Sequence, residues 1–361
     1  MTKKPVVAVA MSGGVDSSVA AALLVKGGFS VFGLMLRLWS EIDDDNGNRC
    51  CNPDSVASAR RVASNLSIPF YVLDARQFFY DTVITSFIYG YTHNLTPNPC
   101  ITCNRNIRWE FLLNYALSAG ADYLATGHYA RISQNPGLSY QLLRGIDGNK
   151  DQSYVLHILT QNQLSVAMFP LGEYTKSEVR QLAQELNLSV AERPDSQDLC
   201  FIGADRNYRQ FLMRHAPQSH NSGDIVDRQG NILGRHEGLA FYTIGQRKGL
   251  RIASAMPLYV LEKDLSRNRL IVGPHNQFGQ SQLIAEKVNW IAGEPPGSSF
   301  PAQVKIRYKA QAVPVEVSLM PGDAIHVHFI NPVHAVTPGQ AAVLYNGEVC
   351  LGGGIISSTT Q

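Results

Sequence analysis

Val6-Val-Ala-Val-Ala-Met-Ser-Gly-Gly-Val-Asp-Ser17 is the stretch of sequence that decides the fold. Its first five residues form an apolar run, which predicts a buried β-strand at residues 6–10. Residues 17–25 have a helical pattern that Gly27-Gly28 ends. A strand, a glycine-rich loop and a helix in this order predict the first part of a βαβ unit.

The same alternation continues over the first 205 residues. Strand patterns recur at residues 31–38, 70–73 and 123–126, and helical patterns at residues 54–65 and 107–119. Further on, Thr175-Lys-Ser-Glu178 matches a capping box and predicts a helix that runs to Leu186. Strands that alternate with helices predict an α/β fold with a doubly wound parallel sheet, the usual layout of a nucleotide-binding domain.

The rest of the chain predicts two further domains. Helical patterns fade after about residue 205, and Asp227-Arg-Gln-Gly-Asn231 is typical of a hairpin turn, so we predict a small central domain at residues 206–280. From Ser281 onward apolar and polar residues alternate, as at residues 304–309 and 325–330. This pattern predicts an antiparallel β-barrel or sandwich, and we take the C-terminal domain at residues 281–361 to be the β-barrel.

Composition sets the class of protein. The chain has 361 residues, of which 45% are hydrophobic, so two or three packed domains are expected. The net charge is only +2, so any nucleic-acid surface must be local. No apolar run approaches eighteen residues, and we therefore expect a cytosolic protein with no membrane span. The cysteines are too few and too irregularly spaced for a secreted disulfide framework: Cys50, Cys51, Cys100, Cys103, Cys200 and Cys350.

The loop Ser12-Gly-Gly-Val-Asp-Ser17 has the properties of an anion site. Glycines let the backbone approach phosphates, Ser12 and Ser17 add hydroxyl donors, and the following helix offers free N–H groups. Asp16 would repel a bare phosphate, but it suits the magnesium side of a ligand that carries its own metal. The alternative is a glycine-rich turn with a capping Asp.

Two other phosphate motifs are missing from the chain. It lacks G-x-x-x-x-G-K-[ST] and G-x-G-x-x-G, which disfavours a kinase or a dehydrogenase. The loop resembles instead the SGGxDS loop of PP-loop ATP pyrophosphatases. That resemblance implies an enzyme that grips the pyrophosphate of ATP and transfers AMP to a substrate oxygen.

Two cysteines lie in polar, turn-rich segments. We place Cys103, in Thr96-Pro-Asn-Pro-Cys-Ile-Thr-Cys-Asn104, just before a helix, where a thiol tends to become a nucleophilic thiolate. Cys200 ends a loop that begins at Arg193, and Asp198 would disfavour its thiolate unless Arg193 or another cation lies nearby. The two thiols could act as a pair, one carrying a persulfide and the other forming a disulfide to release the product. A single cysteine is more often a small buried hydrophobe, which is our interpretation of Cys350.

With the loop and both cysteines considered together, the chain resembles the bacterial tRNA-specific 2-thiouridylase family over nearly its whole length. The resemblance extends to Asn98-Pro-Cys-Ile-Thr-Cys-Asn104, Ala125-Thr-Gly-His-Tyr129, Gly148-Asn-Lys-Asp-Gln-Ser-Tyr154, Ser196-Gln-Asp-Leu-Cys-Phe201, Thr243-Ile-Gly-Gln-Arg-Lys-Gly249 and Lys305-Ile-Arg-Tyr308. So many motifs in order make coincidence negligible.

The resemblance implies a role for individual residues. Those expected around ATP are Ala10, Met11, Ser12, Gly13, Gly14, Val15, Asp16, Ser17, Leu36 and Gly127. Those expected against the target base are Asn98, Pro99 and Cys100. Those expected to touch the tRNA are Lys150, Asp151, Gln152, Arg307 and Tyr308, while His128 and Gln340 help to select it. Without the family context, Lys150 and Arg307 would be ordinary surface charges.

The resemblance also implies the reaction. ATP, with Mg²⁺, adenylates the oxygen on carbon 2 of the wobble uracil, which the enzyme must splay out of the anticodon loop. A cysteine-desulfurase-derived persulfide donor or a sulfur-relay protein loads Cys200, whose outer sulfur adds to carbon 2. Cys103 then frees the product and leaves a Cys103–Cys200 disulfide that a reductant must reset. The central and C-terminal domains are expected to hold the rest of the tRNA.

One position departs from the family pattern. Cys100 stands where many relatives have Asp, and it creates a C-x-x-C with Cys103. In the persulfide scheme Cys100 only lines the base pocket. An iron–sulfur cluster on Cys100, Cys103 and Cys200, or a zinc site completed by Cys50-Cys51, are alternatives that spacing alone leaves open, of which we favour neither.

The sequence alone leaves two rival functions open. A PP-loop ligase or amidotransferase would adenylate a small substrate with the same loop, but it would not need Cys103 or Cys200. A non-catalytic, nucleotide-gated RNA-binding protein would leave the paired thiols without a purpose.

Overall fold

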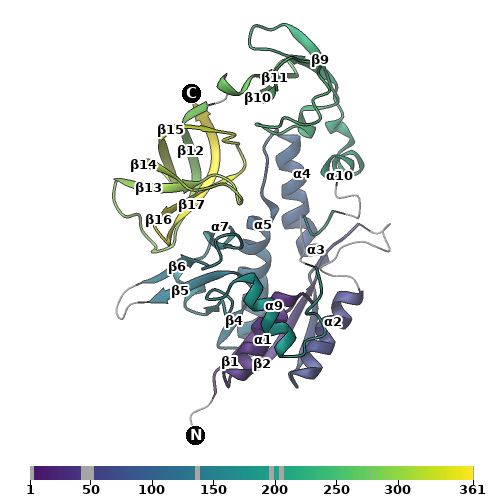
Figure 1. The fold of residues 1–361 in the computed structure, drawn as a ribbon, viewed down its shortest axis with the longest axis vertical. Helices are drawn as coiled ribbons and strands as arrows, with labels where there is room; N and C mark the ends of the chain where they lie inside the picture. The colour runs from purple at the N-terminus through teal and green to yellow at the C-terminus, as the bar shows by residue number, and fades with distance from the viewer. Residues whose placement is uncertain are drawn as a thin grey trace.

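The computed structural model describes residues 4–41, 53–134, 139–194, 199–202, 207–277 and 279–360. Figure 1 shows an α/β part at the N-terminal end, a small sheet at the opposite end of the long axis, and a β-barrel that contains the C-terminus. Within these described ranges, no helix combines the length and the apolar character needed to span a membrane.

The α/β part is built on a parallel sheet with the strand order β3-β2-β1-β4-β7. Its strands are β1 (Val6–Ala10), β2 (Ser30–Arg37), β3 (Phe70–Asp74), β4 (Tyr123–Ala125) and β7 (Ala167–Met168). All neighbouring pairs run parallel. The chain moves outward from β1 to β2 and β3, then crosses to β4 on the other side of β1, so the strand order reverses between β1 and β4.

Helices cover both faces of this sheet, which confirms the doubly wound prediction. Val7 and Val9 pack with α1 (Val15–Lys26), α2 (Pro53–Asn65) and α9 (Lys176–Glu185). Ala8, which points to the opposite face, packs with a helix at residues 99–118. The capping box predicted for α9 is present, because the Thr175 and Glu178 side chains each bond the other's backbone N–H.

The helix at residues 99–118 begins earlier than predicted. It comprises α5 (Pro99–Thr102), the π-helical η2 (Cys103–Leu112) and α6 (Leu113–Ser118). Asn98 caps it by accepting a hydrogen bond from the Cys100 N–H at 3.1 Å. The prediction that Cys103 precedes the helix was therefore wrong. Pro97-Asn-Pro99 is typical of a turn, but an N-cap Asn followed by Pro also starts a helix.

A second helical segment, residues 76–92, was not predicted at all. It comprises α3 (Arg76–Phe79), the π-helical η1 (Tyr80–Ile84) and α4 (Thr85–Thr92). The segment is rich in aromatic and β-branched residues, which have low helix propensity, and burial of Phe79, Ile84 and Phe87 overrides that propensity. The described chain also contains the short helices α7 (Ser153–Leu156), α8 (Gln161–Leu164) and α10 (Tyr208–His215).

The central part is a small four-stranded sheet with the order β10-β11-β8-β9. Its strands are β8 (Gly223–Val226), β9 (Ile232–His236), β10 (Tyr259–Asp264) and β11 (Arg269–Gly273). The predicted hairpin turn joins β8 to β9: Asp227 Oδ1 accepts from the N–H groups of Gln229 and Asn231, each at 2.9 Å.

The C-terminal part is a closed antiparallel barrel, as predicted. Its strands are β12 (Gly279–Trp290), β13 (Ser299–Lys305), β14 (Val313–Met320), β15 (Ala324–His334), β16 (Ala341–Asn346) and β17 (Val349–Thr360). They follow the order β12-β15-β14-β13-β16-β17, and β12 pairs with β17 to close the ring. The alternating pattern at residues 304–309 is strand only as far as Lys305, since the chain turns at residues 307–310.

Two interfaces fix the barrel and the central sheet to the α/β part. The hairpin of β5 (Ala130–Gln134) and β6 (Tyr140–Arg144) pairs with barrel strand β17. Helix 99–118 contributes to both interfaces. Its Trp109 joins a core cluster with barrel residue Tyr345, and its Ile107 joins a second cluster with central-sheet residue Val260.

Candidate active site

The phosphate loop is shaped by hydrogen bonds within itself. The Ser12 N–H donates to Ser17 Oγ at 3.1 Å, and Ser18 Oγ donates to the Gly14 carbonyl at 2.8 Å. Gly13 has φ +73°, and a Cβ built there would lie 2.3 Å from the Ser55 carbonyl oxygen. A side chain at position 13 is therefore excluded by the Ser55 carbonyl, and the positive φ also favours glycine there.

Arg193 stabilises the conformation of this loop through two hydrogen bonds. Its guanidinium donates to the Gly13 carbonyl and to Ser55 Oγ, each at 2.8 Å. The sequence suggested Arg193 as a cation near Cys200, whereas these two hydrogen bonds direct it to the phosphate loop. Asp198, the other residue in that argument, lies outside the described residues.

Asp16 is held between two side chains from distant segments. Tyr129 donates its hydroxyl to Asp16 Oδ1 at 2.8 Å, and Lys176 Nζ lies 2.6 Å from the same oxygen. The Lys176 side chain is only 12% exposed, and its backbone N–H donates to Asp147 Oδ2 at 2.9 Å. The sequence supplied no lysine in the loop, but the fold brings one there from the first turn of α9.

The other residues predicted around ATP converge on the same place. Ala10 ends β1 and Met11 follows it, Leu36 lies near the end of β2, and Gly127 follows β4, so all are at the carboxyl edge of the sheet. A Cβ on Gly127 would lie 2.9 Å from the Asp16 carbonyl carbon and the Ser17 nitrogen. This edge, at the reversal of strand order, is where doubly wound folds bind nucleotides.

His128 lies buried beside this edge as a neutral imidazole. Its Nδ1 is 2.7 Å from Thr126 Oγ1, and Arg108 approaches Nε2 at 3.5 Å. Because Arg can only donate, Nε2 accepts and Nδ1 carries the proton. Burial, followed by the charge of Arg108, lowers the pKa of His128 to about 3.

Cys103 belongs to an apolar cluster, and Cys200 packs against the same cluster. Cys103 is 7% exposed within helix 99–118, and half-buried Cys200 lies in a turn packed against the cluster that contains Phe79, Phe87 and Phe201. Cys103 lies beyond the first helical turn, so the argument for its activation at a helix N-terminus does not hold. Cys350 is a fully buried core residue as predicted, and burial raises the pKa of its thiol to about 12.

The residues expected near the target base lie at the start of this helix. Pro99 is buried, Asn98 caps the helix, and Cys100 is exposed. Burial, followed by the charges of Asp151, Cys100 and Asp147, raises the pKa of Tyr308 to about 12.

The possible metal ligands do not form a cluster in the part of the chain that the structure describes. There, no three His, Cys, Asp or Glu side chains lie close enough together to hold a metal ion. Cys100, Cys103 and Cys200 therefore do not make up a three-thiolate ligand set in this structure. Cys50 and Cys51 lie outside the described residues.

Three residues that were expected to touch the tRNA, Lys150, Asp151 and Gln152, lie in the loop between β6 and α7. Lys150 is half-buried, whereas Asp151 is buried and accepts from the N–H groups of Gly145 at 3.3 Å and Ser153 at 3.0 Å. Gln152 exchanges two hydrogen bonds with the Tyr129 backbone, at 2.9 and 3.0 Å. The Asp151 and Gln152 side chains thus shape this loop.

Two other predicted tRNA residues connect separate parts of the molecule. Arg307 Nη2 donates to the carbonyl of Ile244 at 3.0 Å and to Thr337 Oγ1, which joins the barrel to the central part. Burial lowers the pKa of Arg307. Gln340 Nε2 donates to the Thr96 carbonyl at 2.6 Å, which joins the barrel to the segment before helix 99–118.

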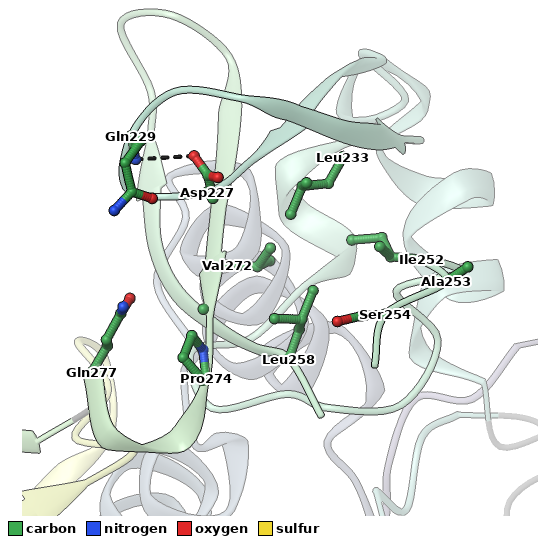
Figure 2. A pocket seen from close by; sticks show the side chains of 11 residues that line it. Asp227, Gln229, Leu233, Ile252, Ala253, Ser254, Leu258, Val272, Pro274 and Gln277 are labelled. Atoms are coloured by element: carbon green, nitrogen blue, oxygen red, sulfur yellow. Dashed lines mark hydrogen bonds between the residues drawn. The ribbon is translucent and has the colours of Figure 1, made fainter. Parts of the chain in front are cut away.

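A separate pocket lies in the central part (Figure 2). Leu233, Ile252, Leu258 and Val272 form its apolar wall, and Asp227 lies at its rim. None of the predicted site residues lines this pocket. It does not contribute to the site at the carboxyl edge of the parallel sheet.

Three protein-family models together match most of the chain. They are described as a tRNA methyl transferase HUP domain at residues 5–204, a tRNA methyl transferase PRC-barrel domain at residues 209–274, and an aminomethyltransferase beta-barrel domain at residues 280–356. The three matched ranges coincide with the α/β part, the central part and the barrel.

Curated relatives match over nearly their full length. A protein of Natranaerobius thermophilus named tRNA-specific 2-thiouridylase MnmA is 46% identical over 98% of both chains. The proteins of the same name from Chloroflexus aurantiacus and Roseiflexus castenholzii are 48% and 46% identical, each over 97% of this chain and 98% of the relative. On this evidence the chain belongs to the tRNA-specific 2-thiouridylase MnmA family.

Proposed function

We propose that this protein is an ATP-dependent tRNA-uridine 2-sulfurtransferase acting on the wobble uridine. The observation that carries the proposal is the near-full-length similarity to proteins named tRNA-specific 2-thiouridylase, which spans all three parts of the chain. The phosphate loop at the reversal of strand order and the two cysteines that border one cluster support it further.

In this proposal ATP binds at the carboxyl edge of the parallel sheet. The backbone of Gly13 and Gly14 and the hydroxyl of Ser12 would hold the pyrophosphate, and Lys176 would neutralise its charge as it leaves. Adenylation joins the uracil oxygen to the α-phosphorus of ATP and breaks the bond to pyrophosphate. Leu36 and Gly127 would flank the adenosine.

Asp16 is suited to the Mg²⁺ that ATP carries. Its Oδ1 is engaged by Tyr129 and Lys176, while Oδ2 makes no hydrogen bond to any other described residue. A carboxylate oxygen is a ligand that Mg²⁺ prefers. Mg²⁺ would supply charge neutralisation on the phosphates, and Tyr129 and Lys176 would hold Asp16 in place to receive it.

Sulfur transfer is assigned to the two cysteines. A persulfide on Cys200 would attack carbon 2 of the adenylated uracil with its outer sulfur. Cys103 thiolate would then attack Cys200 Sγ, and the electron pair of the broken S–S bond would form the carbon–sulfur double bond as AMP leaves. This step leaves a Cys103–Cys200 disulfide, so two electrons from a reductant are needed for each turnover.

The tRNA contacts are proposed more narrowly than the sequence suggested. Lys150 and Tyr308 are retained as tRNA contacts. The hydrogen bonds of Asp151, Gln152, Arg307 and Gln340 within the protein favour a positioning role, in which they hold the loops and the barrel that face the tRNA. A persulfide-donating protein is the remaining partner, and it would need access to Cys200.

Nucleoside mass spectrometry tests the proposal directly. The protein is incubated with tRNA, ATP, Mg²⁺, a persulfide donor and a dithiol, and the digested tRNA is analysed for 2-thiouridine derivatives. We expect thiolated wobble nucleoside, together with AMP and pyrophosphate. Cys200→Ser should yield neither persulfide on the protein nor product. Formation of ADP instead of AMP, or product from Cys200→Ser, would refute the assigned chemistry.

A further inference from the structure

The three cysteines at the site differ in how accessible they are. Cys100 is exposed, Cys200 is half-buried, and Cys103 is buried at 7% exposure. The proposed reaction ends with a disulfide that includes the buried thiol. An external reductant attacks a disulfide in line with the S–S bond, so a buried sulfur is a poor target for a protein reductant.

We propose that Cys100 relays reducing equivalents from an external dithiol to the Cys103–Cys200 disulfide, through a transient Cys100–Cys103 disulfide. This inference rests on the proposed function, because that reaction generates the disulfide. It adds a third redox-active thiol to the pair used in sulfur transfer.

The relay consists of two thiol–disulfide exchanges. The Cys100 thiolate attacks Cys103 Sγ, the Cys103–Cys200 bond breaks, and Cys200 leaves as a thiolate that is ready for the next persulfide. A thiolate of the external dithiol then attacks Cys100 Sγ and displaces Cys103. The second thiol of the reductant closes its own disulfide and releases Cys100, so two electrons pass from the dithiol to the enzyme.

Because the three cysteines are not clustered in this structure, the relay requires that formation of the Cys103–Cys200 disulfide bring Cys200 up to Cys103. The helix at residues 99–118 then sets the spacing of Cys100 and Cys103 for the first exchange. Because the helix starts at Pro99, Cys100 and Cys103 are three residues apart on one helix and face neighbouring positions. Side chains at this spacing have Cβ atoms about 5–6 Å apart, and a disulfide requires about 3.5–4.5 Å, so a shift of about 1–2 Å in the first turn suffices.

The position of Cys100 also suits exchange with an external dithiol. It is the second residue of the helix and its side chain is exposed, so a reductant can reach its sulfur.

Disulfide mapping after a single turnover tests the relay. Protein loaded with one persulfide is mixed with tRNA and ATP without reductant, quenched in acid, alkylated and digested for mass spectrometry. In the wild type we expect a Cys100–Cys103 disulfide with Cys200 alkylated. In Cys100→Ser we expect the Cys103–Cys200 disulfide to accumulate. We also measure the multiple-turnover rate with a protein dithiol and divide it by the single-turnover yield, and in Cys100→Ser this ratio should fall at least tenfold.

A misplaced thiol provides the matched control. In the double variant Cys100→Ser/Thr102→Cys the number of thiols is that of the wild type, but the new thiol lies one residue from Cys103 on another face of the helix. This variant should not regain the wild-type ratio. The relay would be overturned if this double variant regained the wild-type ratio of multiple-turnover rate to single-turnover yield. It would also be overturned if Cys100→Ser alone kept that ratio and the wild type formed only a Cys103–Cys200 disulfide. Wild-type protein that makes no thiolated nucleoside even in one turnover would refute the proposed function itself.

Discussion

Gly13 and Lys176 show at the scale of single residues how the phosphate loop obtains its shape and its charge. Gly13 adopts φ +73° directly beneath the Ser55 carbonyl, and Lys176 brings a nearly buried cation to Asp16. The loop itself contains no lysine. Its ability to hold a polyanion therefore depends on a backbone conformation and on one side chain from another helix.

Replacing Gly13 should reduce the activity of the phosphate loop by more than the strain of a positive φ alone would cause. Gly13→Ala would force a Cβ to within 2.3 Å of the Ser55 carbonyl oxygen, so the loop must move. We expect tRNA-dependent pyrophosphate release to fall at least tenfold. Gly120→Ala is the matched control, since Gly120 has φ +91° but open space around its Cβ position. It should cost only about 1–2 kcal/mol of stability and leave turnover intact.

Removing the charge of Lys176 should slow adenylation. Lys176→Met keeps the side-chain bulk but leaves the departing pyrophosphate without its proposed counter-charge, so we expect pyrophosphate release to fall about 10²-fold. Lys176→Arg should recover part of the rate. The control is Lys26→Met, at the exposed end of α1. Equal rates in Lys176→Met and the wild type would rule out the assigned role.

Helix 99–118 is the element on which the sulfur chemistry depends. It carries Cys100 and Cys103, and its two faces belong to the clusters shared with the barrel and with the central sheet. A change at its N-terminus is therefore expected to displace both thiols.

Loss of the cap on this helix should reduce thiolation by more than the accompanying small loss of unfolding free energy would explain. Asn98→Ala removes the acceptor for the Cys100 N–H and should cost about 1 kcal/mol. Asn207→Ala removes the equivalent bond to Arg209 N–H in α10 and should cost the same. Denaturant unfolding and nucleoside analysis of both variants are compared. Only Asn98→Ala should lose activity, and an equal loss in Asn207→Ala would contradict the argument.

At the scale of the whole molecule, two buried histidines should make the fold sensitive to acid. Burial lowers the pKa of His128 to about 3 and that of His157 to about 4, from 6.5. Below pH 6.5 the unfolded chain binds protons that the folded chain excludes, so stability should fall by about 1.4 kcal/mol per pH unit for each histidine. Denaturant unfolding at pH 7.5, 6.0 and 5.0 measures this slope. His128→Gln and His157→Gln should each flatten it, and unchanged slopes would refute the assignment.

The distribution of charge over the three parts predicts how tRNA binding responds to salt. Residues 207–277 contain ten Lys and Arg against five Asp and Glu, a net +5, although the whole chain carries only +2. We therefore expect tRNA affinity to fall steeply with added salt. Replacing the exposed Arg247 and Lys248 together by Ala should weaken binding and reduce the slope of log affinity against log salt by up to about 2. Lys26→Ala should leave that slope unchanged, and a flat salt dependence of the wild type would contradict the prediction.

Local sequence determined the elements that position the site. The β1 strand, the glycine loop and α1 follow from an apolar run, two glycines and a helical pattern within twenty residues, and the capping box of α9 follows from Thr175 and Glu178. The barrel follows from alternation along each strand. These features depend on neighbouring residues, whose steric and hydrogen-bonding preferences are visible in the chain itself.

Only the tertiary structure decided which of these elements meet. Lys176 is 160 residues from Asp16 and Arg193 is 180 residues from Gly13, and nothing near either residue indicates its partner. Residues 76–92 form helices against their own propensity because their aromatic side chains are buried, and Cys103 lies inside a helix because Asn98 caps it. Burial and charge pairing act between segments that pack together, so their outcome depends on the fold of the whole chain and not on local sequence.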